Sequence, residues 1–181
     1  MASLPEVTGG ACKSCLDFFR QPHEKKECAN SAKSKHFTGY KPPGSQRLNP
    51  FESIDVRETF SWTYGLRFDP TVEDPSAIPH EVSKHLRCEN YHWEATSNMP
   101  HFKEAVVNYS RSCLAVGRSL VKIFALSLDL PEDFLADKFS YPDAALALNY
   151  YPPIEVPKCT TDPTSRASIG SHTDFQLFTM L

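Results

Sequence analysis

The chain has 181 residues, which suits one domain or one domain with an appended subdomain. With 40% hydrophobic and 12% aromatic residues, it has the composition of a globular protein with a sizeable core. Its 19 Lys and Arg residues nearly balance 22 Asp and Glu residues, so the net charge is −3 and no basic surplus favours a nucleic-acid partner.

The sequence shows neither the apolar run of a membrane-spanning helix nor a secretory signal. A membrane-spanning helix needs roughly 18 or more consecutive apolar residues, and no such run is present. Residues 1–6 lack the basic and apolar regions of a secretory signal. We therefore expect no membrane partner and a cytoplasmic location.

Six cysteines are present, and without a secretory signal they are expected to be free thiols in a reducing compartment. Cys12 and Cys15 form a CxxC motif, but no second CxxC or His pair follows at the spacing of a zinc site. The motif also falls in a segment that predicts a helix. A zinc or thiol-redox site is therefore only a third alternative for the function.

The first half of the chain predicts a helix and then a strand. Residues 11–29 predict a helix that breaks near Pro22 and resumes, and the turn-rich residues 37–44 end it. β-branched and aromatic residues alternate over residues 56–64 and predict a strand. The side chains expected near one face of this strand are Val56, Phe60, Trp62 and Tyr64. Residues 69–79 are acidic and contain proline, which predicts a surface loop.

A long helix is predicted over residues 100–128. Its apolar residues step by four and three, which places them in one stripe along the helix. These residues are Phe102, Val106, Tyr109, Cys113, Val116, Leu120 and Ile123. We interpret the stripe as core packing rather than as a cofactor site. A second, short helix is predicted to open at Pro131.

Strands are predicted towards the end of the chain. Residues 144–151 suit a strand that ends at Pro152, and residues 175–181 alternate as another strand after a polar loop. Helices thus precede strands, the order of an α+β fold. The chain ends inside a strand pattern, whereas a natural domain boundary should fall in an exposed polar linker. We therefore expect this end to be a cut.

His172 and Asp174 are the first candidates for chemistry. Side chains two residues apart on a strand point to the same face, so the imidazole and the carboxylate would converge on one point. With one further His they would complete a 2-His-1-carboxylate facial triad, which leaves iron(II) open positions for a cosubstrate and dioxygen. The HxD tripeptide alone is weak evidence, because it often arises by chance on a solvated surface.

The surrounding motifs resemble a known family. Residues 148–153 (Leu-Asn-Tyr-Tyr-Pro-Pro) and residues 170–181, with the HTD motif followed by Phe, are similar to the isopenicillin N synthase-like iron(II)/2-oxoglutarate dioxygenases. Upstream, residues 35–44 look like the loop of that family, and residues 57–60 (Arg-Glu-Thr-Phe) resemble its KE-x-F strand. The resemblance covers residues 15–181 in the expected order.

The resemblance implies a fold with three parts. Residues 1–14 are unassigned, residues 15–140 would form a mostly helical region, and residues 141–181 would start the core. That core would be a partial double-stranded β-helix (jelly roll), incomplete at the C-terminus. The fold class is therefore expected to be α+β, with helices followed by a partial jelly roll.

The resemblance also implies a metal site and a reaction. His172 and Asp174 would bind Fe(II), and Asn149 and Tyr151 match the Asn-x-Tyr that often contacts the carboxylates of 2-oxoglutarate. An ordinary strand Asn and Tyr is the open alternative for the second pair. With dioxygen, 2-oxoglutarate as cosubstrate and ascorbate as a candidate reductant, cosubstrate decarboxylation would precede hydrogen abstraction from a small organic molecule. The outcome would be hydroxylation, desaturation or ring formation, and some relatives dispense with 2-oxoglutarate.

Several family features have no counterpart in the sequence. The third iron ligand and the Arg-x-Ser that pairs with a 2-oxoglutarate carboxylate have no position here, and Ala147 stands where many members carry Arg or Lys. Other histidines lack ligand-like context and are expected to be surface or core residues, namely His80, His85, His92 and His101. The 181 residues are therefore expected to show no turnover alone. Two hypotheses remain: a partial dioxygenase chain, or a non-catalytic truncated paralogue or interaction fragment.

Overall fold

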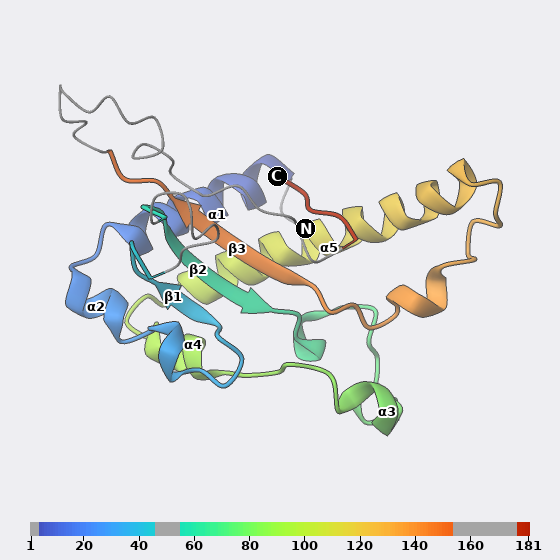
Figure 1. Ribbon diagram of the computed structural model, residues 1–181, viewed down its shortest axis with the longest axis horizontal. Helices are drawn as coiled ribbons and strands as arrows, with labels where there is room; N and C mark the ends of the chain where they lie inside the picture. Colours follow the sequence, from blue (N-terminus) through green and yellow to red (C-terminus); the bar gives the residue numbers. More distant parts are fainter. Residues whose placement is uncertain (1–3, 46–54, 154–176) are drawn as a thin grey trace.

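The computed structural model describes residues 4–45, 55–153 and 177–181 (Figure 1). Its α-helices are α1 (Leu4–Phe19), α2 (His23–Glu27), α3 (His80–Ser83), α4 (Tyr91–Ala95) and α5 (Phe102–Ser127). Its strands are β1 (Gly39–Lys41), β2 (Glu58–Thr63) and β3 (Ala145–Tyr150). Short 3-10 helices are η1 (Ser31–Lys33), η2 (Leu66–Phe68), η3 (Pro75–Ala77) and η4 (Ala136–Phe139). In this part of the chain no helix is both long and apolar enough to cross a membrane.

The strands form one antiparallel sheet in the order β1-β2-β3. Phe60 in the central strand β2 lies opposite Tyr40 in β1 and Leu148 in β3. Residues that lie directly opposite each other project from the same face of a sheet. These three side chains therefore point to one side, where α1 and α5 pack against each other and against the sheet (Figure 1).

An aromatic cluster fills the space between the sheet and the two long helices. The ring of Phe18 in α1 lies 4.9 Å from Phe60, 5.1 Å from Phe102 in α5 and 5.9 Å from Tyr40, measured between ring centroids. All four side chains are at most 1% exposed. Burying large aromatic side chains is a strong source of folding free energy, so this cluster is the main core of the described residues.

The core face of the sheet also holds a buried ion pair. Glu58 at the start of β2 pairs with Lys26 of α2 and accepts a hydrogen bond of 2.6 Å from the Tyr40 hydroxyl. Lys26 donates a further hydrogen bond of 3.1 Å to the carbonyl oxygen of Phe19. Each charged group is therefore compensated, as burial in a core requires.

One glycine is required where β1 approaches the segment after α2. Gly39 has a φ of 103°, a conformation that favours glycine. A Cβ atom at this position would lie 2.3 Å from the carbonyl oxygen of Ala29. The same oxygen accepts a hydrogen bond of 2.7 Å from the Tyr40 amide, so the close approach fixes β1 beside that segment.

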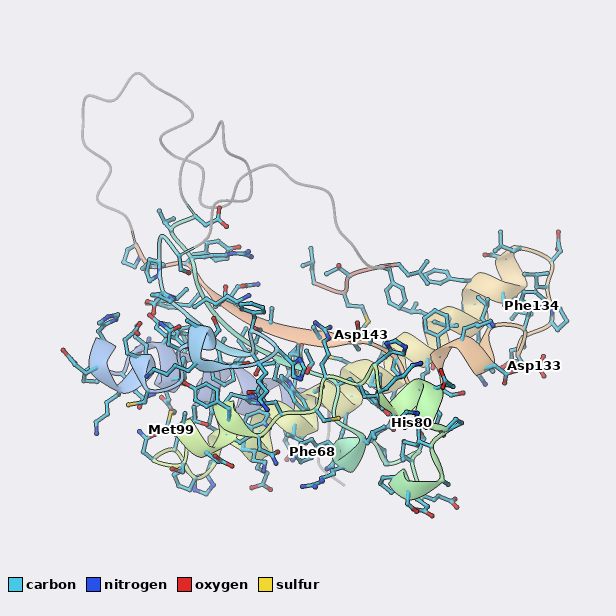
Figure 2. The ribbon with its side chains drawn as sticks, turned by 60° about the horizontal axis from the view of Figure 1, so that its bottom comes forward. Phe68, His80, Met99, Asp133, Phe134 and Asp143 are labelled. Atoms are coloured by element: carbon cyan, nitrogen blue, oxygen red, sulfur yellow. The ribbon has the colours of Figure 1, made fainter. Side chains whose placement is uncertain are left out.

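The long predicted helix is confirmed as α5, but its apolar stripe is core for only part of its length. Phe102 and Val106 are buried, whereas Val116 and Ile123 are 49% and 56% exposed. The physical reason is that α5 runs beyond the sheet, towards the turn that holds Asp133 and Phe134 (Figures 1 and 2). In that part of α5 the buried residues are Val121 and Ala125, which lie on a neighbouring face of the helix and not on the predicted stripe.

The N-terminal helices and the two predicted strands at 56–64 and 144–151 are confirmed as α1, α2, β2 and β3. The expected order of helices before strands is wrong, because β1 and β2 precede α3, α4 and α5. Residues 37–44 hold β1 as well as turns, because Gly39 and its pairing with β2 override the local turn signals. Helices beside a small antiparallel sheet nevertheless agree with the α+β class.

Three further expectations need correction. Of the strand expected over residues 175–181, residues 177–181 are not a strand, since no described strand pairs with them, and residues 175 and 176 lie outside the described residues. The regular element after Pro131 is the 3-10 helix η4, which begins five residues later. Asp69 is buried at 5% exposure rather than on the surface, because Arg118 of α5 pairs with it.

The expected three-part division crosses continuous elements. Helix α1 runs from Leu4 to Phe19, through the expected boundary between residues 14 and 15. Strands β1 and β2 belong to the expected helical region, yet they share a sheet with β3, which follows residue 141. The sheet therefore joins the second and third expected parts.

Candidate active site

The two faces of β3 have different characters. Leu146, Leu148 and Tyr150 are partly buried against the core, whereas Ala145, Ala147 and Asn149 are exposed on the other face. The residues of β2 that lie opposite this second face are Thr59, Ser61 and Thr63. We call the surface formed by these six residues the open face of the sheet. Its side chains are small or polar, so it offers hydrogen-bonding groups rather than apolar packing.

Asn149 is held on the open face by its neighbour on β2. Thr59 is 5% exposed, and its hydroxyl donates a hydrogen bond of 2.9 Å to the Oδ1 atom of Asn149. With Oδ1 occupied, the Asn149 Nδ2 group has no hydrogen-bond partner among the described residues. Two N–H donors therefore point away from Thr59, which suits a carboxylate ligand.

Tyr151 follows two residues after Asn149 and is 48% exposed. Strand β3 ends at Tyr150, so the alternation that would bring the Tyr151 phenol to the side of the Asn149 carboxamide is an expectation for this residue. Of the two predicted cosubstrate residues, Asn149 lies at one end of the open face, and Tyr151 directly follows the strand.

The two predicted iron ligands, His172 and Asp174, lie outside the described residues. An imidazole and a carboxylate are the donor types that suit iron(II). Within residues 4–45, 55–153 and 177–181 no group of three or more His, Cys, Asp or Glu side chains could hold a metal ion.

The other histidines occupy the positions expected of surface or core residues. His80, His85 and His101 are exposed, and His80 lies on the peripheral helix α3 (Figure 2). His92 in α4 is 1% exposed, with its Nδ1 atom 3.1 Å from the Thr38 hydroxyl oxygen. Burial lowers the pKa of His92 to about 4, so this imidazole is neutral near pH 7.

The CxxC motif lies on helix α1. Cys12 is exposed and Cys15 is partly buried. Burial, with a further contribution from Cys12, raises the pKa of the Cys15 thiol to about 11. A raised pKa disfavours the thiolate that zinc binding and thiol exchange need. The five cysteines in the described part of the chain are free thiols.

Sequence reasoning did not single out Thr59, which holds Asn149, or Lys41, which lies opposite Thr59 on β1. Alternation along the predicted strand would have placed the Thr59 side chain on the face of the strand away from the core, because its neighbour Phe60 faces the core. The pairing of residues 59 and 149 could not be predicted, because it joins positions 90 residues apart. Long-range register depends on tertiary packing rather than on local pattern.

The chain is similar in sequence and in fold to several known proteins. The chain is 49% identical to the 2-oxoglutarate-Fe(II) type oxidoreductase ppzC of Metarhizium majus over 177 residues, which cover 96% of this chain and 47% of the relative. A 2OG-Fe(II) oxygenase family protein from Caulobacter crescentus matches with a TM-score of 0.64 and 22% identity, over 87% of this chain and 47% of that one. JOX2, solved in complex with 2OG, Fe and JA, matches with a TM-score of 0.57 and 19% identity, over 84% of this chain and 39% of that one.

The two structural matches show a shared fold, and no protein-family model matches the chain. The chain spans about half the length of the curated relatives it matches. Sequence identity of this level over nearly the whole chain, together with the shared fold, identifies its ancestry. The chain belongs to the iron(II)/2-oxoglutarate-dependent dioxygenase family, whose cofactor is Fe(II) and whose cosubstrate is 2-oxoglutarate.

Proposed function

We propose that the chain contributes part of the active site of a dioxygenase that oxidises a small organic molecule with Fe(II), 2-oxoglutarate and dioxygen. The observation that carries the proposal is the Asn149 carboxamide, which Thr59 holds on the open face and whose Nδ2 group has no partner among the described residues. The chain spans about half the length of its relatives. We therefore propose the complete reaction for a protein that contains this chain and not for these 181 residues alone.

Each proposed site residue has a distinct role. The His172 imidazole and the Asp174 carboxylate would hold the metal. Bound Fe(II) would supply the dioxygen activation and cosubstrate decarboxylation that lead to C–H oxidation. Asn149 and Tyr151 would donate hydrogen bonds to a carboxylate of 2-oxoglutarate and orient it. Such charge-assisted hydrogen bonds are shorter and roughly twice as strong as neutral ones.

Metal binding tests the proposal directly. Mn(II) can replace Fe(II) in a titration followed by the electron paramagnetic resonance of the free ion. We expect the 181-residue chain to bind Mn(II), and His172→Ala or Asp174→Ala to weaken binding by about tenfold or more. His80→Ala, at an exposed histidine of α3, is the matched control and should bind like the unaltered chain. Equal binding by all four proteins would contradict the proposed ligands.

Turnover is a separate measurement. With added Fe(II) and ascorbate, the chain alone is expected to decarboxylate 2-oxoglutarate no faster than His172→Ala, because the third iron ligand and the Arg-x-Ser that the family carries beyond the HxD motif have no position in these 181 residues. Decarboxylation above that control would show that these residues suffice for the reaction, and the expectation of inactivity would be wrong. Loss of both metal binding and turnover would favour the non-catalytic alternative.

A further inference from the structure

One end of the open face carries a cation on the edge strand. Lys41 in β1 lies opposite Thr59 in β2, and Thr59 lies opposite Asn149 in β3. Directly opposite side chains project to the same side, so these three form one row across the sheet. The neighbour of Lys41, Tyr40, is buried in the core, which confirms that Lys41 points to the open side.

A second cation lies beside this row. Arg57 directly precedes β2, and the next residue, Glu58, points into the core. Alternation therefore places Arg57 on the open side, two residues before Thr59. The Arg57 side chain is 16% exposed, and its Nε atom lies 3.8 Å from the Oδ2 atom of Asp55.

The charges at this end of the sheet are only partly compensated. Lys41 is partly buried and has no ion pair or hydrogen bond from its ammonium group to a described residue. Burial lowers the pKa of Lys41, and the charge of Arg57 lowers it further, so the two cations act on each other. Asp55 offsets one of the two positive charges. Keeping like charges close in a partly buried place costs free energy, which a bound anion would recover.

We propose that Lys41 and Arg57 form the cationic half of a carboxylate-binding subsite on the open face, with Thr59 and Asn149 beside them. Ala147, which shares this face on β3, carries no charge, so within the described residues the cations at this end of the sheet come from β1 and from the residue before β2. The inference rests on the proposed function only for the identity of the ligand. The carboxylate belongs either to 2-oxoglutarate or to the substrate.

Carboxylate binding can be measured on the chain without metal. Proton–nitrogen correlation spectra of the labelled 181-residue chain are followed while 2-oxoglutarate is added to about 50 mM, which detects dissociation constants in the millimolar range. We expect saturable shifts at Lys41, Thr59 and Asn149. Lys41→Met and Arg57→Gln should each weaken binding by about tenfold, as expected for the loss of one charge-assisted contact. Lys41→Arg should restore binding.

Matched controls separate a subsite from general charge effects. Lys122→Met removes an ion-paired lysine on α5, and Arg67→Gln removes an exposed arginine of η2; neither should change binding. The dimethyl ester of 2-oxoglutarate should cause no saturable shift. Absence of saturable shifts with the diacid, or equal weakening by the control variants, would overturn the proposal.

Two further experiments identify the ligand and test the proposed function separately from the carboxylate subsite. If acetate competes with 2-oxoglutarate for the shifts and Asn149→Ala weakens the diacid but not acetate, the subsite takes the cosubstrate. If Asn149→Ala changes neither, the subsite takes a carboxylate of the substrate. His172→Ala should abolish Mn(II) binding and leave the metal-free shifts unchanged. If the unaltered chain does not bind Mn(II) but still shows the 2-oxoglutarate shifts, the proposed function is contradicted and the carboxylate subsite is not.

Discussion

At the scale of single residues, Asp69 shows how burial and hydrogen bonding compete. Burial alone would raise its pKa, but Arg118, Tyr64 and Thr71 donate hydrogen bonds that hold the pKa well below its usual range. The Arg118 guanidinium contacts both carboxylate oxygens, at 3.0 and 2.6 Å. This pair attaches the middle of α5 to the segment after η2, away from the aromatic cluster.

We predict that Asp69→Asn lowers the free energy of unfolding by about 2–3 kcal/mol, because it leaves the Arg118 guanidinium without its counter-ion. Urea unfolding at pH 7 measures the loss. The control is Asp143→Asn, which breaks an exposed pair with Arg87 and should cost less than about 1 kcal/mol. A carboxylate with a depressed pKa stabilises above its unfolded pKa, so the effect of Asp69→Asn should shrink as the pH falls below about 4. Equal losses in both variants would contradict the prediction.

His92 makes the folding stability depend on pH in a second way, and burial of its imidazole determines that stability falls as the pH falls. Its pKa falls to about 4 in the folded chain, mainly by burial, so between that value and the unfolded pKa only the unfolded state binds the proton. Stability is therefore complete above about pH 6.5 and is lost as the pH falls, by on the order of 2 kcal/mol at pH 4.5.

Urea midpoints of the unaltered chain and of His92→Gln, measured from pH 7 to pH 4.5, check this prediction. The variant is less stable at pH 7, because it disturbs the contact with Thr38, but it should lose less stability on acidification. Parallel pH profiles for the two proteins would show that His92 is not the titrating group.

At the scale of elements, the periodicity of apolar residues along the sequence predicted the long helix and two of the three strands. Alternation over residues 56–64 and 144–151 predicted β2 and β3, and the three-four spacing predicted α5. Strand β1 was missed because it has three residues in a turn-rich stretch and exists through its pairing with β2. The stripe on α5 was only half correct, because which helix face is buried depends on where the sheet ends.

The candidate site was predictable to a similar degree. Asn149 and Tyr151 followed from a family motif, and the structure adds that Asn149 lies on the open face, paired with Thr59. Lys41 and Arg57 could not be grouped with them, because the register that aligns β1, β2 and β3 is a tertiary property. Whether His172 and Asp174 converge stays a prediction from strand alternation.

The alternation of β3 can be tested as a property of the element. Leu148 lies opposite Phe60 and packs against the core, so Leu148→Ala should lower the free energy of unfolding by about 2 kcal/mol. Ala147→Ser, one residue earlier on the open face, should change it by less than about 0.5 kcal/mol. Urea unfolding of the two variants makes the comparison. Similar costs would mean that β3 does not present one face to the core.

At the scale of the whole molecule, the sheet joins distant parts of the chain. Residues 39–41 and 145–150 flank β2 on its two sides, so the centre of the sheet is completed only when the late strand docks. The ring of Tyr150 stacks on Phe19 with centroids 5.4 Å apart, which ties β3 to α1 as well. The start of the expected jelly-roll core is thus part of the same folding unit as the helices.

We therefore predict that a fragment of residues 1–140 does not fold cooperatively, although it retains every α-helix in the described part of the chain. Without β3, the central strand β2 becomes an edge paired only with the three-residue β1, and small two-stranded sheets are marginal in water. A fragment of residues 1–153 restores β3 and is the matched control. Near-ultraviolet circular dichroism on heating reports on Trp62 and Trp93, both buried in the core. We expect a sharp transition for residues 1–153 and a gradual one for residues 1–140; equally sharp transitions would show that the first 140 residues fold as a separate domain.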